Sequence, residues 1–298
     1  MIKRKILDKG SYGIVIKNGF NTTSNSISKL FIYKQDFKQE IKNHKIISSI
    51  DYNNNFTIKL LNHSQIYFDD IDIHKKDYNE LKEFTKNKRI FQITYEYGGC
   101  GLHQFLYKNI DIHSFLSKFI HIIEGIKILQ ENNLIHTDIK IDNILFNDNK
   151  FVLIDFGLLK YKDDFLNHIP YLNNNNIIHF PSEFKINSSS FEELNLNLFL
   201  NTINLQNSIH KKEFIKLNHY LKNELFKFYK SKKFSLNLNK FDIYQLGLVL
   251  YQIILLINKN INKNIFNIIR KMLEPFPHKR TEIKNDFLFD LKKIIQDV

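Results

Sequence analysis

Apolar and polar residues alternate through much of the first hundred positions of the chain. A period of two is typical of strands that bury one face. The pattern predicts strands within residues 3–19, 25–33 and 89–97, and a hairpin within residues 56–68. Residues 36–50 differ, because their apolar side chains recur at helical spacing. We therefore expect a β-rich region with one helix.

The pattern changes after the glycines of residues 98–101. Residues 112–132 carry the long apolar stripe of a helix, and residues 241–257 are apolar on nearly every side, which predicts a fully buried helix. We expect an α+β protein with a small β-rich N-terminal lobe, residues 1–97, and a larger, mainly helical C-terminal lobe, residues 98–298. Together they would form one bilobal domain.

Composition is that of a folded protein. Hydrophobic residues make up 43% of the 298 positions, which is enough for a sizeable core. The chain has no run of about 18 uncharged apolar residues, and its charged first residues lack the apolar segment of a signal peptide. Cys100 is the single cysteine, which excludes intrachain disulfides and multi-thiolate metal sites. We expect a protein of the reducing cytoplasm without a transmembrane segment.

The formal net charge of the chain is +12. A field of this sign attracts phosphates, acidic proteins and anionic surfaces before any specific contact forms. The abundance of Lys, Ile and Asn also fits an AT-rich coding genome, so charge alone does not identify a partner.

Two aspartates stand 17 positions apart, each near the end of a short apolar run. Asp138 is followed by Lys140 and Asn143, and Asp155 is followed by a Phe-Gly pair. Phosphoryl transfer to a hydroxyl group requires aligned reactants and neutralised phosphates, usually with Mg²⁺. An Asp can accept the hydroxyl proton, a Lys can steady the phosphoryl group, and an Asn with a second Asp can hold the metal ion. The pattern therefore indicates phosphoryl transfer.

This stretch resembles the catalytic loop H-R-D-L-K-x-x-N and the D-F-G motif of the eukaryotic protein kinase superfamily. Seven residues match in identity and spacing: His136, Asp138, Lys140, Asn143, Asp155, Phe156 and Gly157. The resemblance implies ATP and Mg²⁺ as cofactors, with Mn²⁺ as a substitute. It also implies Asp138 as the catalytic base, Lys140 as a catalytic group on the γ-phosphate, and Asn143 and Asp155 as ligands of nucleotide and metal. Lys140 at this spacing is typical of serine/threonine kinases.

The resemblance extends to the glycine-rich loop of the family. Gly10, Ser11, Gly13 and Val15 in KGSYGIV match this loop, in which backbone N–H groups approach the phosphates. Asp8 stands where the first glycine is expected, and its carboxylate would repel phosphate.

The strand SISKLF resembles the family's V-A-I-K strand. It makes Lys29 the expected phosphate-positioning lysine, ahead of the competitors Lys17 and Lys34. Its catalytic partner in the resemblance is a glutamate on the following helix, and Glu40 is the only glutamate before residue 80.

The stretch TYEYGG, residues 94–99, resembles the hinge between kinase lobes. The resemblance implies that main-chain groups of Glu96 and Tyr97 bind adenine and that Tyr95 is the gatekeeper. A role for Tyr95 in the core alone stays open.

Three later motifs separate protein kinases from small-molecule kinases. They are FPSE with Glu183, FDIYQLG with Asp242, and KMLEPFPHKRTE with Arg280. The resemblance implies that Asp242 braces the catalytic loop and that Glu183 pairs with Arg280, since either charge buried alone would be costly. It covers about residues 5–290 with one gap.

The chain departs from the family at Thr137. Many kinases have an arginine there, which binds a phosphate on the activation segment. The segment from Leu158 to Phe180 contains no Ser or Thr, and only Tyr161 and Tyr171 could be phosphorylated. We expect a kinase that is not controlled by phosphorylation of this segment, although drift in a biased genome would leave the same pattern.

An insertion at about residues 190–238 is a second departure. It separates Glu183 from Asp242 by 58 residues, where the family usually has a short connection. Residues 209–234 contain eight lysines, two glutamates and one helical stripe of apolar residues: Phe214, Leu217, Leu221, Leu225 and Phe228. The simpler interpretation is a packed helix with a solvated basic face. The other is a docking surface for an acidic protein, nucleic acid or an anionic membrane.

Three functions are compatible with the sequence. The first is a serine/threonine kinase that acts on hydroxyl groups of a protein substrate. The second is a pseudokinase or scaffold, which the departures at Asp8 and Thr137 would permit. The third is a small-molecule kinase, similar to aminoglycoside or choline kinases, which the three later motifs disfavour. The base composition and compactness resemble kinases of large DNA viruses, for which the location would be the host cytoplasm or the virion.

Overall fold

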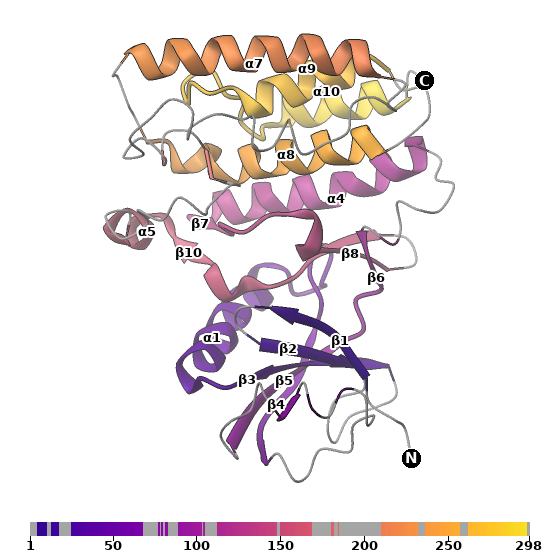
Figure 1. The fold of residues 1–298 in the computed structure, drawn as a ribbon, viewed down its shortest axis with the longest axis vertical. Helices are drawn as coiled ribbons and strands as arrows, with labels where there is room; N and C mark the ends of the chain where they lie inside the picture. Colours follow the sequence, from indigo (N-terminus) through magenta and orange to yellow (C-terminus); the bar gives the residue numbers. More distant parts are fainter. Residues whose placement is uncertain are drawn as a thin grey trace. The chain divides into compact units, whose positions relative to one another are not determined.

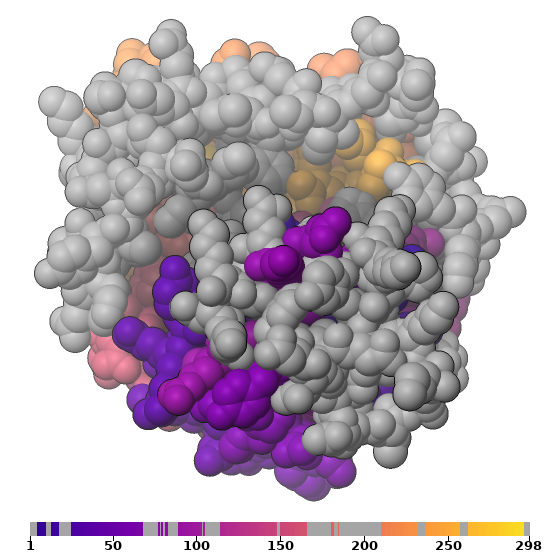
Figure 2. Space-filling view, turned by 60° about the horizontal axis from the view of Figure 1, so that its bottom comes forward, coloured from indigo at the N-terminus to yellow at the C-terminus, as the bar shows by residue number. Residues whose placement is uncertain are grey.

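The computed structural model describes most of the chain, and the described residues are coloured in Figures 1 and 2. They are residues 5–10, 13–17, 25–67, 77, 79, 81–82, 89–102, 104, 112–147, 150–168, 180–181, 184, 210–231, 236–256 and 262–296. The chain divides into two compact units, each of which is described by itself. Unit 1 comprises Met1–Gly99 with Val152–Gly157, and unit 2 comprises Cys100–Phe151 with Leu158–Val298.

Unit 1 contains an antiparallel five-stranded sheet in the order β1-β2-β3-β5-β4 (Figure 1). Its strands are β1 (Lys5–Gly10), β2 (Gly13–Lys17), β3 (Ser26–Phe31), β4 (Leu60–Tyr67) and β5 (Arg89–Glu96). Alternate side chains of these strands, among them Ile14, Ile16 and Leu30, form a buried cluster. The period of two in the sequence thus produces one buried face of the sheet.

One helix, α1 (Lys34–Ile50), packs against β3 and β5 in unit 1. The helix buries Glu40, Asn43, His44 and Ile47. These positions lie three and four residues apart, so they form a single face. Three of the four residues on this buried face are polar, which sets the face apart from an ordinary core stripe.

Unit 2 is mainly helical. Its principal helices are α4 (Ile112–Glu131), α7 (Lys211–Ser231), α8 (Phe241–Leu256), α9 (Asn264–Leu273) and α10 (Asn285–Gln296). In Figure 1, α8 lies between α4 and α9, and α7 lies alongside α9 at the outer edge of the unit. Every residue of α8 except Gln252 and Leu256 is buried, as its apolar sequence predicts.

Short elements connect these helices. They are the strands β6 (Cys100–Gly101), β7 (Leu134–Ile135), β8 (Ile144–Asn147), β9 (Lys150–Leu153) and β10 (Lys160–Tyr161), the helix α5 (Lys162–His168), and the 3₁₀ turns Ile141–Asn143, Phe156–Leu158 and Leu238–Lys240. Strand β10 pairs with β7, and β6 and β8 pair antiparallel. Strand β9 begins in unit 2 and ends in unit 1.

The predicted α+β class, with a β-sheet region followed by a helical region, is confirmed. Two details differ from the sequence-based expectation. Residues 152–157, expected in the larger lobe, belong to unit 1. The predicted hairpin within residues 56–68 is wrong, because Leu60–Tyr67 forms one strand that pairs along its length with β5. That stretch contains no glycine to make a tight turn.

Candidate active site

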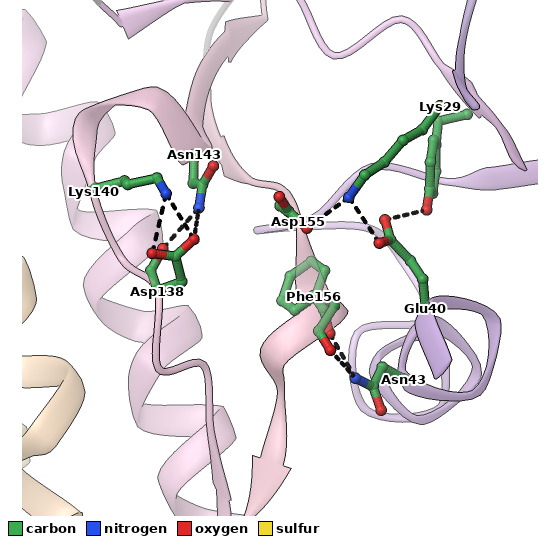
Figure 3. Close-up of polar contacts among 10 residues, drawn as sticks. Lys29, Glu40, Asn43, Asp138, Lys140, Asn143, Asp155 and Phe156 are labelled. Atoms are coloured by element: carbon green, nitrogen blue, oxygen red, sulfur yellow. Dashed lines mark hydrogen bonds and ion pairs between the residues drawn. The ribbon is translucent and has the colours of Figure 1, made fainter. Parts of the chain in front are cut away.

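In unit 1, one predicted site residue, a lysine, contacts two others. Nζ of Lys29, on β3, lies 2.8 Å from Oε2 of Glu40 on α1 and 2.8 Å from Oδ1 of Asp155 (Figure 3). Burial lowers the pKa of Lys29, but the two carboxylates outweigh burial, and the pKa of this ammonium is raised. The lysine is therefore positively charged at neutral pH. The predicted choice of Lys29 and Glu40 as partners agrees with this contact.

The gatekeeper candidate Tyr95 makes a second contact with Glu40. Its hydroxyl donates a 2.9 Å hydrogen bond to Oε1 of Glu40, so each carboxylate oxygen has its own donor. Burial, together with the nearby carboxylate of Glu40, raises the pKa of Tyr95 well above its ordinary value, which keeps the hydroxyl protonated as a donor. The sequence placed Tyr95 correctly at the end of a buried strand but gave no sign of this bond, because the partner lies 55 positions away.

Asn43 ties α1 to the Asp-Phe-Gly segment. Its side-chain amide donates to the carbonyl oxygens of Phe156 at 2.7 Å and Gly157 at 3.2 Å (Figure 3). Gln39, one turn earlier, donates in turn to Oδ1 of Asn43 at 2.8 Å. A Cβ atom at Gly157 would lie 3.2 Å from Oε2 of Glu40, so glycine permits this close approach. Asn43 was not recognised from the sequence.

His44 completes the same face of α1. Its ring centroid lies 5.4 Å from that of Tyr95 and 6.4 Å from that of Phe156, both in edge-on geometry. Burial lowers the pKa of His44 to about 4, so the ring is neutral at physiological pH. The side chain therefore acts as an aromatic packing group next to Phe156.

Asp155 has a left-handed backbone with φ of 63°. This conformation is uncommon for a residue other than glycine and costs of the order of 1–3 kcal/mol where the surroundings enforce it. The contact with Lys29 and the bonds from Asn43 to the next two residues hold the segment in place. Such strain often accompanies functional positions.

Unit 2 holds a second cluster, centred on Asp138. Nζ of Lys140 lies 3.1 Å from Oδ1 and 2.9 Å from Oδ2 of Asp138. The amide nitrogen of Asn143 donates to the backbone oxygen of Asp138 at 2.8 Å and to its Oδ2 at 2.9 Å. Figure 3 shows the amide oxygen of Asn143 pointing away from Asp138. This oxygen is the atom that Asn143 could offer to a cation.

Two side chains of α8 hold the backbone of this catalytic loop. Asp242 accepts the N–H groups of His136 at 2.8 Å and Thr137 at 3.1 Å. Gln245 accepts the N–H of Ile139 at 3.0 Å and donates to the carbonyl of Thr137 at 2.8 Å. The position of Asp242 beneath the loop agrees with the sequence-based expectation. Gln245 was missed, although its place one turn after Asp242 would have suggested a shared face.

Thr137, which replaces the family's arginine, bonds to the start of the activation segment. Its hydroxyl donates to the carbonyl of Leu158 at 3.0 Å. The residue has a φ of 69°, a costly conformation for a β-branched side chain. The pairing of β10 with β7 and a 3.0 Å backbone bond from Lys162 to Asn133 hold the following residues. The beginning of this segment is thus fixed by hydrogen bonds that involve no phosphate.

Three of the four residues predicted for the glycine loop are described: Gly10 lies on β1, and Gly13 and Val15 lie on β2. Gly10 ends β1 and faces Gly13 at the start of β2, while Val15 faces Lys29 across β2 and β3. A Cβ atom at Gly13 would collide with the carbonyl of Leu30, so the pairing of β2 with β3 requires glycine at this position. Ser11 lies outside the described residues.

Glu96 and Tyr97, which the sequence predicts as adenine contacts, have backbone N–H groups that bond within unit 1. The N–H of Glu96 bonds to the carbonyl of Lys59 at 2.9 Å, and the N–H of Tyr97 bonds to that of Asn25 at 3.3 Å. Both donors are therefore engaged within unit 1, so these residues could offer adenine only their carbonyl oxygens.

The expected Glu183–Arg280 pair cannot be followed, because Glu183 lies outside the described residues. Arg280 is buried, donates to the backbone oxygens of Glu274 at 3.0 Å and Lys240 at 3.2 Å, and stacks over the ring of Tyr244.

Oxygen ligands suited to Mg²⁺ are present in both units. Asp155 in unit 1 offers a carboxylate, and Asn143 in unit 2 offers an amide oxygen; hard divalent cations prefer such groups. Among the described residues there is no group of three or more His, Cys, Asp or Glu side chains that could hold a metal alone. Each unit thus offers one oxygen ligand of the kind that a hard divalent cation prefers.

Comparison with known proteins gives the class. The family model of protein tyrosine and serine/threonine kinases matches residues 3–180, more than half of the chain. The chain belongs to this protein kinase family. None of the described helices has the length and apolar character needed to cross a membrane.

Particular relatives are distant. Mitogen-activated protein kinases 13 and 4 of Arabidopsis thaliana are 25% and 26% identical over 166 residues, which are 53% of this chain and 41% and 39% of those proteins. "Putative serine/threonine-protein kinase L232" of Acanthamoeba polyphaga mimivirus is 26% identical over 157 residues, 51% of this chain and 22% of that protein. The chain thus matches less than half the length of each of these relatives.

Proposed function

We propose that the chain is an active serine/threonine protein kinase, which transfers the γ-phosphate of ATP to hydroxyl groups of proteins. The observation that carries this proposal is the Lys29 contact with both Glu40 and Asp155. This contact orients Lys29 and Asp155, the groups proposed to bind phosphate and metal, before ATP binds. Membership of the kinase family supports the same conclusion.

Each residue would have a distinct task. Lys29, held by Glu40, would position the phosphates of ATP, and the backbone of Gly10, Ser11, Gly13 and Val15 would cover them. Asn143 and Asp155 would hold Mg²⁺, or Mn²⁺ in its place, which neutralises phosphate charge when bound. The amide of Asn143 orients Asp138.

The reaction itself would centre on Asp138 and Lys140. The Asp138 carboxylate would accept the proton of the attacking hydroxyl as the new phosphorus–oxygen bond forms and the bond from the γ-phosphorus to the bridging oxygen breaks, which releases ADP. Lys140, 2.9 Å from that carboxylate, would stabilise the transferred group. Lysine at this position supports serine/threonine specificity.

Regulation would not require phosphorylation of the activation segment. Thr137 occupies the place of the phosphate-binding arginine and bonds instead to Leu158. We propose that this bond replaces a phosphate contact at the start of the segment.

A scaffold without activity is the second candidate, because Asp8 stands where a phosphate-facing glycine is expected. The N–H of Lys9 bonds to the Asp8 carboxylate at 2.8 Å, so this group is already engaged with its own strand.

The test is transfer of labelled γ-phosphate from Mg-ATP to a panel of acidic and basic proteins, with Asp138→Asn as the matched variant. We expect label on Ser or Thr with the wild type and a loss of at least about 100-fold in the variant, which retains ATP binding. Label on Tyr would contradict the specificity. Bound ATP without transfer by the folded wild type would favour the scaffold.

A further inference from the structure

Helix α7 has one face that packs against other described helices and one face whose side chains are exposed. Phe214, Leu217, Leu221, Leu225 and Phe228 are all buried, as the sequence predicts. The ring of Phe214 meets Tyr251 of α8 at 4.8 Å and Phe266 of α9 at 5.1 Å. The position of the helix is therefore fixed by its apolar stripe, and its opposite face is directed outward (Figure 1).

The acidic residues of α7 are neutralised on its packed side. Glu224 is buried and bonds to Lys227 at 2.6 Å and Lys279 at 2.9 Å. Glu213 lies 3.5 Å from Lys263. The salt bridges hold the pKa of Glu224 below its ordinary value against the opposing effect of burial, so the group is ionised and its charge is compensated. Glu224 compensates Lys227, and in the part of the chain that the structure describes neither glutamate pairs with another lysine of the outward face.

The outward face carries a series of lysines. Its exposed lysines are Lys211, Lys212, Lys216, Lys222, Lys227 and Lys230. Apart from Lys227, none of them forms an ion pair with another residue that the structure describes. At 100° per residue these lysines lie on an arc that contains no acidic side chain. This arc of α7, called the basic face below, has an unbalanced positive charge.

Two apolar side chains are exposed on the same face. Ile215 is 51% exposed and Phe226 is 43% exposed. They are 11 residues apart, close to three helical turns, so they lie on one side of the helix roughly 16 Å apart. Nζ of Lys230 lies 4.3 Å from the centre of the Phe226 ring. The basic face thus combines a row of ammonium groups with two apolar contacts between them.

We propose that the basic face binds the surface of an anionic lipid membrane. Lysine ammonium groups are attracted to anionic lipids, and apolar side chains between them can enter the boundary of headgroups and acyl chains. Phosphate contacts supply most of the affinity for nucleic acid, and an exposed isoleucine makes none of them. The face also lacks arginine, the side chain best suited to bidentate phosphate contacts. The inference goes beyond the proposed catalytic function and does not depend on it.

The test is co-sedimentation of the full chain with vesicles, of phosphatidylcholine alone or with 30 mol% phosphatidylserine. The variant Lys212→Gln/Lys216→Gln/Lys222→Gln/Lys230→Gln removes four charges of the basic face. The control Lys38→Gln/Lys45→Gln/Lys59→Gln/Lys293→Gln removes four exposed charges elsewhere. Each lysine near an anionic membrane contributes roughly five-fold in affinity. We expect the basic-face variant to lose at least about 100-fold and the control to lose less than about five-fold.

A third variant separates a membrane from another polyanion. Ile215→Ser/Phe226→Ser leaves the charge unchanged, and we expect it to weaken vesicle binding by about ten-fold or more while leaving binding to duplex RNA unaltered. All substitutions are at exposed positions, and circular dichroism with thermal unfolding checks the fold. Equal binding to both vesicle types, equal losses in the two lysine variants, or no effect of the apolar substitutions would each overturn the proposal.

Discussion

The charged pair of Lys29 and Glu40 is held by neighbours as well as by mutual attraction. Glu40 has Lys29 at one oxygen and the Tyr95 hydroxyl at the other. A carboxylate with two donors has little rotational freedom, so its position relative to Lys29 is set before any ligand binds. The proposed role of Lys29 in positioning phosphate requires this pre-organisation.

His44 gives a prediction about pH. The ordinary pKa of 6.5 applies in the unfolded chain, whereas burial lowers the folded value to about 4. Between these values the unfolded state binds more protons, so the free energy of unfolding falls as pH falls from 6.5 to 4, by up to about 3 kcal/mol from this residue. His44→Leu cannot be protonated and should lose that part of the pH dependence in urea unfolding.

The neighbours of His44 should not add to the difference in pH dependence between the wild type and His44→Leu. Tyr95 and Phe156 face its ring, and neither titrates in this range, while Glu40, one turn earlier, is present in both proteins. Exposed His121, changed to Gln, is the control and should leave the pH dependence unaltered. Identical slopes for the wild type and His44→Leu would show that His44 is not buried in a neutral form.

At the scale of elements, α1 holds the Asp-Phe-Gly segment through side chains of one face. Glu40 acts through Lys29, Asn43 bonds to two carbonyls, and His44 packs against Phe156. A helix that moved away would lose all three contacts together. The orientation of Asp155 is thus coupled to the position of α1.

Substitution of Asn43 tests this coupling and rests on the proposed function. Asn43→Ala removes the two hydrogen bonds to carbonyl oxygens and the one from Gln39, which should lower stability by about 1–2 kcal/mol and kcat/KM for ATP roughly ten-fold. Asn43→Asp places a carboxylate against two carbonyl oxygens and should be more severe. The readouts are kinetics and hydrogen exchange of residues 156–158. Gln39→Ala, which leaves the carbonyl bonds intact, is the control. Unchanged exchange and kinetics in both Asn43 variants would show that α1 does not hold the segment.

Several elements could be predicted from the sequence because one physical signal dominates each. The buried stripe of α7 and the apolar sequence of α8 specify helices with a known packed face. The resemblance to protein kinases implied a lysine–glutamate pair, and Glu40 could be chosen for it because no other glutamate precedes residue 80. In contrast, the long-range bonds of Asn43, Tyr95 and Gln245 join residues 55 to 114 positions apart, and no local pattern marks such partners.

At the scale of the whole molecule, the match to the kinase family and the basic face of α7 occupy different parts of the chain. The family model ends at residue 180, whereas α7 and its basic face lie beyond it. The elements within the match contain the residues proposed for catalysis. The helices of residues 211–296 support the catalytic loop through α8 and carry the basic face through α7.

The central claim is that this protein transfers phosphate in a metal-dependent reaction. The most direct measurement compares the wild type with Asp155→Asn for transfer of labelled γ-phosphate at increasing Mg²⁺. We expect the wild type to transfer label and the folded variant to lose at least about 100-fold at every Mg²⁺ concentration, because its amide is a weaker ligand for the ion and for Lys29. Equal transfer by the two proteins, or none by a folded wild type that binds ATP, would contradict the claim.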